Sequence, residues 1–409
     1  MISQQQKAII QATLPAVEQN AVNITSCFYP LMFQRYPSVL NYFNQANQQQ
    51  GTQREALANA VVAYAKNLDR LDVLSDAVSL IVQKHCSLGI LPEHYPIVGE
   101  CLLAAIAEVL GDAVDDAVLD AWGAAYQQLA EILIGSEQAT YQFMAERQGG
   151  WNGLRDFEVI EKRQESEVIT SFVLAPAHDR EVIDFHPGQY ITIVKTLNER
   201  QVRRSYSLSS SPGRDTLQIS VKREDGGTLS NHLHDDVQPG DVLALTAPCG
   251  DFTLNQNPKP LMLVTAGVGI TPALSMLKAS LGDYAVAGRE IHFLHCARNG
   301  QAHAFGREVR HLAETHAHVS STFIYSHPAE SDLSGETGLA DDFGFLTETH
   351  LKDHLGAKRD VELYVLGPKI FMQQVLQLAA DLGIPEAQTH FEFFGPLEEL
   401  AIDRSQHAA

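Results

Sequence analysis

The hydrophobic pattern of the chain changes twice along its length, and this change constrains the fold more than any other feature. Up to about residue 144 apolar residues recur at helical spacing, as at Leu57, Val61 and Leu68. Beyond residue 150 apolar and polar residues alternate with a period of two, as over residues 217–221. From Pro260 onward, short apolar runs alternate with helical stretches. The sequence therefore predicts an all-α unit, a small antiparallel β-barrel or sandwich, and an α/β unit with a parallel sheet.

The changes of pattern place the expected boundaries. We expect the all-α domain over residues 1–140, a linker over 141–151, the β-barrel domain over 152–256 and the α/β domain over 257–409. Turn signals such as Pro187-Gly188 and Pro239-Gly240 separate the expected strands of the middle unit.

The composition excludes several classes of protein. The chain has 409 residues and a formal net charge of -21, which argues against nucleic acid or an anionic membrane as a partner. No apolar run approaches the ~18 residues of a membrane-spanning segment, and the first ten residues do not form a secretion signal. None of the 5 cysteines is spaced as in an iron–sulfur or zinc motif. We expect a cytoplasmic protein.

A glycine-rich turn in the last unit predicts a nicotinamide dinucleotide site. After the apolar run 261–264 come, in order, Gly267, Val268, Gly269, Ile270, Thr271 and Pro272. Glycines let the backbone approach a pyrophosphate, and the helix that follows offers unpaired N–H groups. A tight strand-to-helix turn without a ligand is the alternative. A second turn at Gly367-Pro368 ends another expected strand, and both turns should share the carboxyl edge of one sheet.

Two motifs in the middle unit predict a flavin site. An arginine that can neutralise a pyrophosphate, an aromatic ring and two hydroxyls follow one another on an expected strand as Arg204, Ser205, Tyr206 and Ser207. A glycine turn then enters a short helix between Gly227 and Ser230, and Tyr190 adds an aromatic residue before another strand. Taken singly, Arg204 and Tyr206 could equally belong to an exposed strand face.

In their order, these motifs resemble the ferredoxin–NADP reductase superfamily over about residues 151–396. The resemblance implies FAD on the barrel and NAD(P)H on the α/β unit. A segment near the C-terminus is similar to the one that covers the isoalloxazine ring in that superfamily; it comprises Glu392, Phe393, Phe394, Gly395 and Pro396. The superfamily usually has a cysteine before the glycine-proline turn, where this chain has Leu366.

In the all-α unit, one histidine lies on an apolar helical face. His85 continues the stripe formed by Val78, Ile81 and Val82. A histidine in this position is most often a hydrogen-bonded core residue. Helices that enclose a flat apolar pocket, however, are also how globins hold haem.

With Phe43 after a proline corner, and with residues 53–57 and 83–85, the chain resembles the flavohaemoglobin family, a globin fused to a ferredoxin–NADP reductase-like module. The resemblance covers nearly the whole chain and implies haem b with His85 as its proximal iron ligand. It further implies that Tyr29 and Gln53 form a distal polar pair and that Leu57 and Phe43 pack on the haem. Tyr95 and Glu137 would form a proximal relay, and Lys84 would neighbour the iron ligand.

The family resemblance also implies the reaction. NAD(P)H would reduce FAD, FAD would reduce the haem iron, and the ferrous haem with bound O₂ would convert nitric oxide to nitrate. Its partners would be the small molecules O₂, NO and NAD(P)H, and the protein would be a monomer. Two alternatives stay open: a gas sensor or O₂-binding protein kept ferrous by its own reductase, and a diaphorase that passes electrons to another protein.

Pro30 follows the expected distal tyrosine inside an expected helix. Proline removes one helical hydrogen bond and disfavours the α conformation at the residue before it. We therefore expect the helix either to be kinked at Tyr29 or to begin there.

Overall fold

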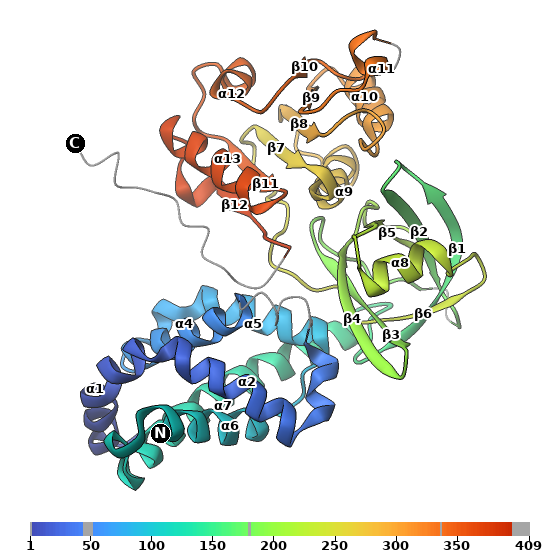
Figure 1. The fold of residues 1–409 in the computed structure, drawn as a ribbon. Coiled ribbons are helices and arrows are strands. Elements are labelled where there is room, and N and C mark those ends of the chain that lie inside the picture. Colours follow the sequence, from blue (N-terminus) through green and yellow to red (C-terminus); the bar gives the residue numbers. More distant parts are fainter. Residues whose placement is uncertain (1, 44–51, 179–180, 336–337, 395–409) are drawn as a thin grey trace. The chain divides into compact units, whose positions relative to one another are not determined.

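The computed structural model describes residues 2–43, 52–178, 181–335 and 338–394, except for the side chains of 52–56, 58 and 59 (Figure 1). Its contacts divide the chain into two compact units, each of which is described by itself. The first comprises residues 1–154 together with 192–204, and the second comprises residues 155–191 and 205–394.

The N-terminal part is helical, as predicted. Its α-helices are α1 (Gln4–Gln19), α2 (Ala21–Arg35), α4 (Thr52–Lys66), α5 (Ser75–Leu88), α6 (His94–Leu110) and α7 (Asp116–Glu146), with short 3₁₀ turns at Pro37–Tyr42, Leu71–Leu74 and Gly111–Ala113. Local signals define their ends: Ser3 and Gln6 form a capping box, Asp115 caps α7, and Gly89 ends α5 with a φ of 75°. The apolar faces of α1, α2, α6 and α7 meet in one core.

Helix α2 continues through Pro30, so the alternative that it begins at Tyr29 is wrong. The lost hydrogen bond is tolerated because Phe28, Tyr29 and Met32 are buried and hold the helix in the core. Helix α7 extends over the first six residues of the segment 141–151, which we expected to be a linker.

The middle part forms a six-stranded sheet in the order β4-β3-β6-β1-β2-β5. Its strands are β1 (Arg155–Gln164), β2 (Ile169–Pro176), β3 (Tyr190–Leu197), β4 (Arg200–Ser207), β5 (Leu217–Lys222) and β6 (Val242–Leu245). Strand β1 is antiparallel to β2 and β6, and β2 is antiparallel to β5. A bridge between Leu208, directly after β4, and Ile219 of β5 joins the two edges, as in a closed barrel. Helix α8 (Thr228–Asp235) follows β5.

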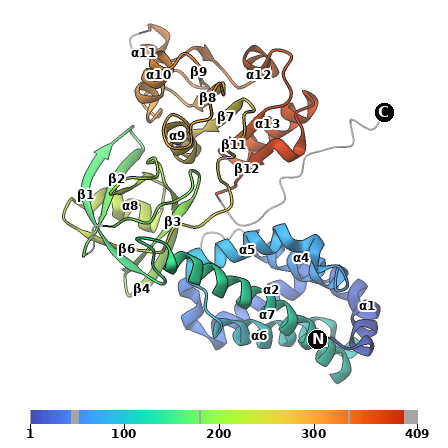
Figure 2. The same ribbon diagram turned by 180° about the vertical axis from the view of Figure 1, so that it is seen from behind.

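The C-terminal part is a parallel sheet in the order β10-β9-β8-β7-β11-β12. Its elements are β7 (Leu261–Ala266), α9 (Ile270–Ser280), β8 (Ile291–Ala297), α10 (Gly306–Thr315), β9 (Val319–Tyr325), α11 (Glu330–Leu333), β10 (Asp342–Phe343), α12 (Glu348–Leu355), β11 (Glu362–Leu366), α13 (Lys369–Asp381) and β12 (Thr389–Phe391). Helices α9 and α10 pack on one face and α12 and α13 on the other, as Figures 1 and 2 show from opposite sides. The sequence predicted this class of fold, and the strands confirm it.

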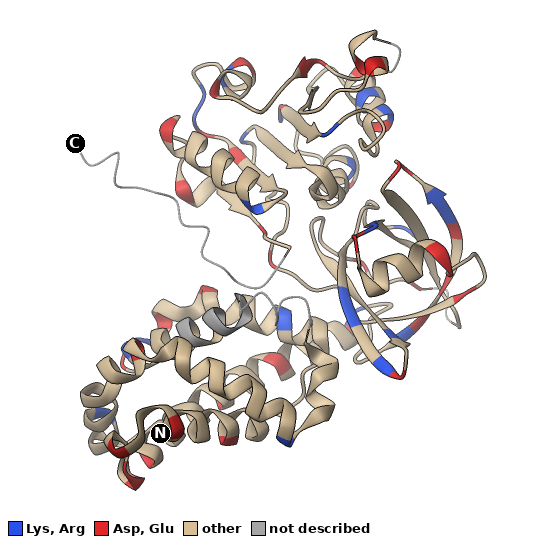
Figure 3. Ribbon diagram, viewed as in Figure 1, with Lys and Arg blue, Asp and Glu red and all other residues tan. Residues whose placement is uncertain are grey.

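Charged residues are scattered over the helices and strands of both units, and Figure 3 shows no continuous basic stripe among the described residues. Over the same residues, no helix combines the length and apolarity that crossing a membrane requires.

Candidate functional site

His85, Tyr95 and Glu137 meet at one point in the helical part, although they come from α5, α6 and α7. The Nδ1 atom of His85 lies 2.7 Å from Oε1 of Glu137 and 3.1 Å from the Tyr95 hydroxyl. Tyr95 donates to the same Oε1 atom at 2.5 Å. Because Nδ1 is engaged by these partners, Nε2 is the nitrogen of His85 that is left to bind a metal.

The carboxylate of this cluster is almost fully buried. Glu137 is 1% exposed, and its Oε2 atom has no hydrogen-bond partner among the described residues. Burial and the Glu137 carboxylate together raise the pKa of Tyr95, so the phenol stays protonated and remains a donor. Tyr126 of α7 donates to the Tyr95 carbonyl at 2.7 Å and fixes the start of α6.

Three aromatic rings surround the expected distal position. The ring of Tyr29 is 5.9 Å from that of Phe33 and 5.8 Å from that of Phe43, between ring centres. Phe43 and Leu57 pack against the core that contains Tyr29. Tyr29 is 4% exposed. These positions suit a flat apolar ligand, but their role stays a prediction.

Two other residues expected at this site are placed differently. Gln53 belongs to α4, but its side chain lies outside the described residues. Lys84 directly precedes His85 in α5 and is exposed.

The residues expected to bind flavin lie on β4 and at the start of α8. Ser205 and Tyr206 are half-buried on β4, and Ser207 is buried. The backbone N–H of Glu224 donates to the Ser230 hydroxyl at 3.3 Å and so folds the turn before α8. A Cβ at Gly227 would lie 2.3 Å from that hydroxyl, so the turn requires glycine.

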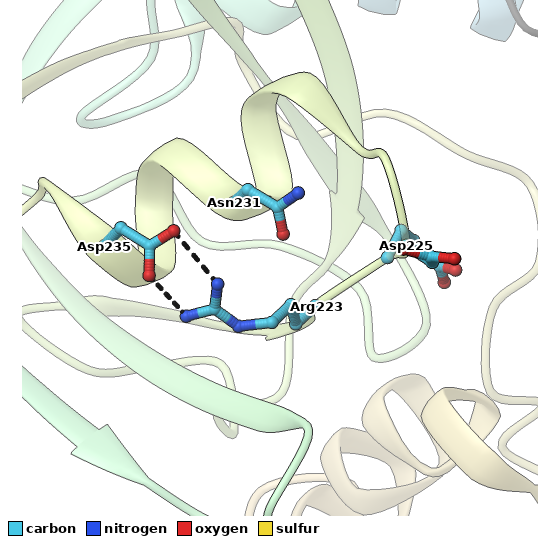
Figure 4. A pocket seen from close by; sticks show the side chains of 5 residues that line it. Arg223, Asp225, Asn231 and Asp235 are labelled. Atoms are coloured by element: carbon cyan, nitrogen blue, oxygen red, sulfur yellow. Dashed lines mark hydrogen bonds and ion pairs between the residues drawn. The ribbon is translucent and has the colours of Figure 1, made fainter.

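Figure 4 shows a small pocket beside this turn. It is lined by Arg223, Glu224, Asp225, Asn231 and Asp235. The Arg223 guanidinium binds both carboxylate oxygens of Asp235 at 3.0 and 2.6 Å, and this pair lowers the pKa of Asp235. Its positive charge is therefore matched by a carboxylate. The pair ties the end of α8 to the end of β5.

Tyr190 is buried at the start of β3, where it bridges Cys249 and packs on Gly250. Phe393 follows β12 and packs against the core of the parallel sheet, whereas Phe394 is 46% exposed. Glu392 lies between β12 and Phe393, and Gly395 and Pro396 lie outside the described residues.

The two glycine turns of the last part lie side by side, as predicted. Strands β7 and β11 pair in parallel, and a Cβ at Gly269 would lie 2.5 Å from the Leu366 carbonyl oxygen. Gly267 has a φ of 55°, which favours glycine. Thr271 holds the start of α9, because its hydroxyl donates to the Val268 carbonyl at 3.0 Å. The side chains of Ile270 and Pro272, on either side of it, are buried. Leu366 is fully buried in the same core as Ile270.

The described residues fit the three groups that the sequence implies. An imidazole held at Nδ1 by a buried carboxylate suits iron in haem. The glycine turn before α8 and the hydroxyl-rich strand β4 suit FAD, and the turn at Gly267–Gly269 suits a dinucleotide.

Comparisons with known proteins agree with this arrangement. Residues 26–133 match the globin family, residues 156–254 match oxidoreductase FAD-binding domains, and residues 263–377 match oxidoreductase NAD-binding domains. A flavohemoprotein of Burkholderia sp. (strain TH2) is 48% identical over 401 residues, which are 98% of this chain and 100% of the relative. A flavohemoprotein of Pseudomonas aeruginosa is also 48% identical over 98% of the chain.

The chain belongs to the flavohaemoprotein family. Among solved structures, flavohemoglobin from Malassezia yamatoensis, which has bound FAD and haem, matches with a TM-score of 0.82 at 26% identity over 96% of this chain and 100% of that one. The FAD/NAD-binding domain of a nitric oxide dioxygenase from Vibrio cholerae matches with a TM-score of 0.53 at 34% identity, over 59% of this chain and 99% of that one. The expected globin, FAD and NAD domains are confirmed. This flavohaemoprotein is an oxidoreductase with haem, FAD and a nicotinamide nucleotide as its cofactors.

Some neighbours of the site were not found from the sequence. Phe33 follows Tyr29 by one helical turn, and this spacing could have indicated it. The hydrogen bond of Tyr126 to α6 and the contact of Arg203 with α5 depend on long-range packing that no local pattern contains.

Proposed function

We propose that this flavohaemoprotein is a nitric oxide dioxygenase that uses NAD(P)H and O₂ to convert NO to nitrate. The observation that carries the proposal is the buried carboxylate of Glu137, which is hydrogen-bonded to both His85 and Tyr95. When bound, haem iron would supply the O₂-binding centre, and FAD would take up two electrons as a hydride and release them one at a time.

On the proximal side, Glu137 would accept a hydrogen bond from Nδ1–H of His85 and make the imidazole a stronger electron donor. Tyr95 holds the carboxylate in this position by donating to the same oxygen. Such a histidine would hold the haem iron and supply it with electron density, which would suit oxygen chemistry better than reversible oxygen binding alone. This feature supports an enzyme more strongly than an O₂ store.

On the distal side, Tyr29 would donate a hydrogen bond to oxygen atoms that carry partial negative charge. The rings of Phe33 and Phe43 would exclude water around it. Gln53 would be the second distal polar group, and Leu57 would pack on the ring of the haem.

In the reductase, Arg204 and the start of α8 at Gly227 and Ser230 would hold the FAD pyrophosphate. Tyr206 and the hydroxyls of Ser205 and Ser207 would face the flavin, with Tyr190 beside them. The turn Gly267–Gly269 and the first turn of α9 would hold the nicotinamide nucleotide. The segment from Glu392 to Pro396 would cover the flavin ring, and Lys84 would stand beside the haem ligand.

A test is to supply NADH, O₂ and NO to the purified holoprotein and to measure NO consumption and nitrate. A dioxygenase forms nitrate only when both NADH and O₂ are present. A sensor or O₂ store would bind NO without NADH-dependent turnover. A diaphorase would reduce an added cytochrome faster than its own haem. Either of these last two results would contradict the proposal.

We also propose that the chain acts as a cytoplasmic monomer. All 5 cysteines are free thiols, which a reducing compartment preserves. Gel filtration with light scattering tests the monomeric state.

A further inference from the structure

Arg203 of β4 is half-buried against the end of the helix that carries His85. It belongs to the same compact unit as the helices of the globin. Its Nη1 atom donates to the Leu88 carbonyl at 2.9 Å, and its Nη2 atom donates to the Gln201 side chain at 2.7 Å. Its guanidinium carbon lies 4.5 Å from the centre of the Tyr42 ring, a cation–π contact.

Leu88 is the last residue of α5 and follows His85 by three positions. Backbone N–H groups of the turn beyond it satisfy the carbonyls of His85 and Cys86 at 3.0 and 3.1 Å. The Leu88 carbonyl instead receives the charged donor of Arg203. A cation at a helix C-terminus also interacts favourably with the helix dipole. Arg203 therefore completes the C-terminal cap of the helix that carries the iron ligand.

The partial burial of this charge carries a desolvation cost. No ion pair involves Arg203 within the described residues, and its Nε atom is buried without a hydrogen-bond partner. Burial lowers the pKa of the guanidinium. An apolar side chain of similar size would fill the space at lower cost in desolvation, so stability alone does not explain an arginine here.

The next residue along β4 is Arg204, the first residue of the expected flavin motif. Its Nη1 atom donates to the carbonyl of Arg203 at 2.7 Å. One strand thus contacts the end of the haem-ligand helix at one residue and begins the flavin motif at the next.

We propose that Arg203 is a positioning residue for electron transfer from flavin to haem: it fixes β4 to the end of α5, and its charge stabilises the reduced state of the iron. This inference rests on the proposed flow of electrons from the reductase to the globin. It predicts two separable effects, because the contact is geometric and the charge is electrostatic.

The test uses the complete holoprotein with three variants: Arg203→Gln, Arg203→Lys and, as a matched control, Arg200→Gln. Arg200 is exposed on the same strand. Anaerobic stopped-flow mixing with NADH follows flavin bleaching and haem reduction separately. Hydrogen exchange of residues 86–91 and the haem midpoint potential are measured on the same preparations.

In Arg203→Gln we expect flavin bleaching at the wild-type rate, haem reduction slowed about tenfold or more, a lower haem potential and faster exchange in residues 86–91. Arg203→Lys keeps the charge, so its haem potential should stay near that of the wild type. Hydrogen exchange in residues 86–91 should be as fast as in Arg203→Gln. Arg200→Gln should change none of these.

Haem reduction and a haem potential in Arg203→Gln equal to those of Arg200→Gln would overturn the inference. An equal slowing of flavin bleaching would also overturn it, because it would place Arg203 at the flavin or nucleotide site instead. Wild-type haem that NADH cannot reduce would contradict the proposed function as well, and that result is visible before any variant is made.

Discussion

Tyr95 and Glu137, which lie 42 residues apart in the sequence, are joined by a buried hydrogen bond of 2.5 Å. The same carboxylate oxygen is hydrogen-bonded to Nδ1 of His85. This shared oxygen links three helices and gives the imidazole an anionic partner away from water.

Replacing Glu137 by Gln should weaken the proposed catalysis. The amide keeps the shape of the side chain but removes the negative charge that makes His85 electron-rich. Loss of such a partner typically costs about 10–100-fold in activity or metal affinity. NO turnover and the iron–histidine stretching frequency measure the effect. Glu131→Gln on the exposed face of α7 is the control and should match the wild type.

Tyr95→Phe should alter the stability of the protein at alkaline pH. The pKa of Tyr95 is raised in the folded state, so the unfolded chain loses this proton first as the pH rises. The stabilisation is complete below the unfolded pKa of about 10 and decreases above it. Urea unfolding should show a shallower alkaline loss in Tyr95→Phe, with about 1 kcal/mol less stability near neutrality. Identical slopes above pH 10 would be inconsistent with this explanation.

Tyr29→Phe should release O₂ from the reduced protein faster. The ring contacts with Phe33 and Phe43 remain, but the hydroxyl donor is lost. A hydrogen bond to a charged acceptor contributes about 1.5–3 kcal/mol, which is roughly a 10–150-fold change in dissociation rate. Tyr64→Phe is the matched control, because the Tyr64 hydroxyl is buried without a partner among the described residues. Equal O₂ release from both variants would remove Tyr29 from the proposed site.

Gly269→Ala should weaken NADH binding. The new methyl group would lie 2.5 Å from the Leu366 carbonyl oxygen, so the turn must move away from β11. Such overpacking typically costs about 1–3 kcal/mol. A raised KM for NADH with an unchanged flavin content is expected. Gly282→Ala, whose methyl group meets atoms only at 3.6 Å and beyond, is the control.

His303 should make the reductase sensitive to acid. Burial, and to a lesser extent Arg310, lowers the pKa of His303 to about 3. Below the ordinary value of about 6.5 the unfolded chain binds a proton that the folded chain does not, so stability falls as the pH falls towards about 3, by about 1.4 kcal/mol per pH unit. His303→Gln should show a shallower fall in urea titrations between pH 6.5 and 4. The exposed His311→Gln should keep the wild-type slope.

Features with a local cause were predictable from the sequence. Helical spacing identified the N-terminal helices. The turn at Gly267–Gly269 was predictable because a backbone that packs closely against its surroundings requires glycine at that position. Pro30 shows the limit of such rules, since its local cost is outweighed by the burial of Tyr29 and Met32.

Pairings across the fold were not predictable from the residues themselves. The spacing of His85 and Glu137 in the sequence does not indicate that they are in contact. Only the family resemblance implied a relay between them. Arg203 has no motif of its own, because its contacts with Leu88 and Tyr42 arise only when distant segments pack together.

The most direct test of the account measures nitrate formed per NADH oxidised when the aerobic holoprotein is supplied with NO. Conversion of NO and O₂ to nitrate takes up one electron, so about two nitrate ions per NADH are expected. A His85→Ala protein should consume NADH without forming nitrate. NO that disappears without nitrate, or nitrate that forms at the wild-type yield in His85→Ala, would contradict the account.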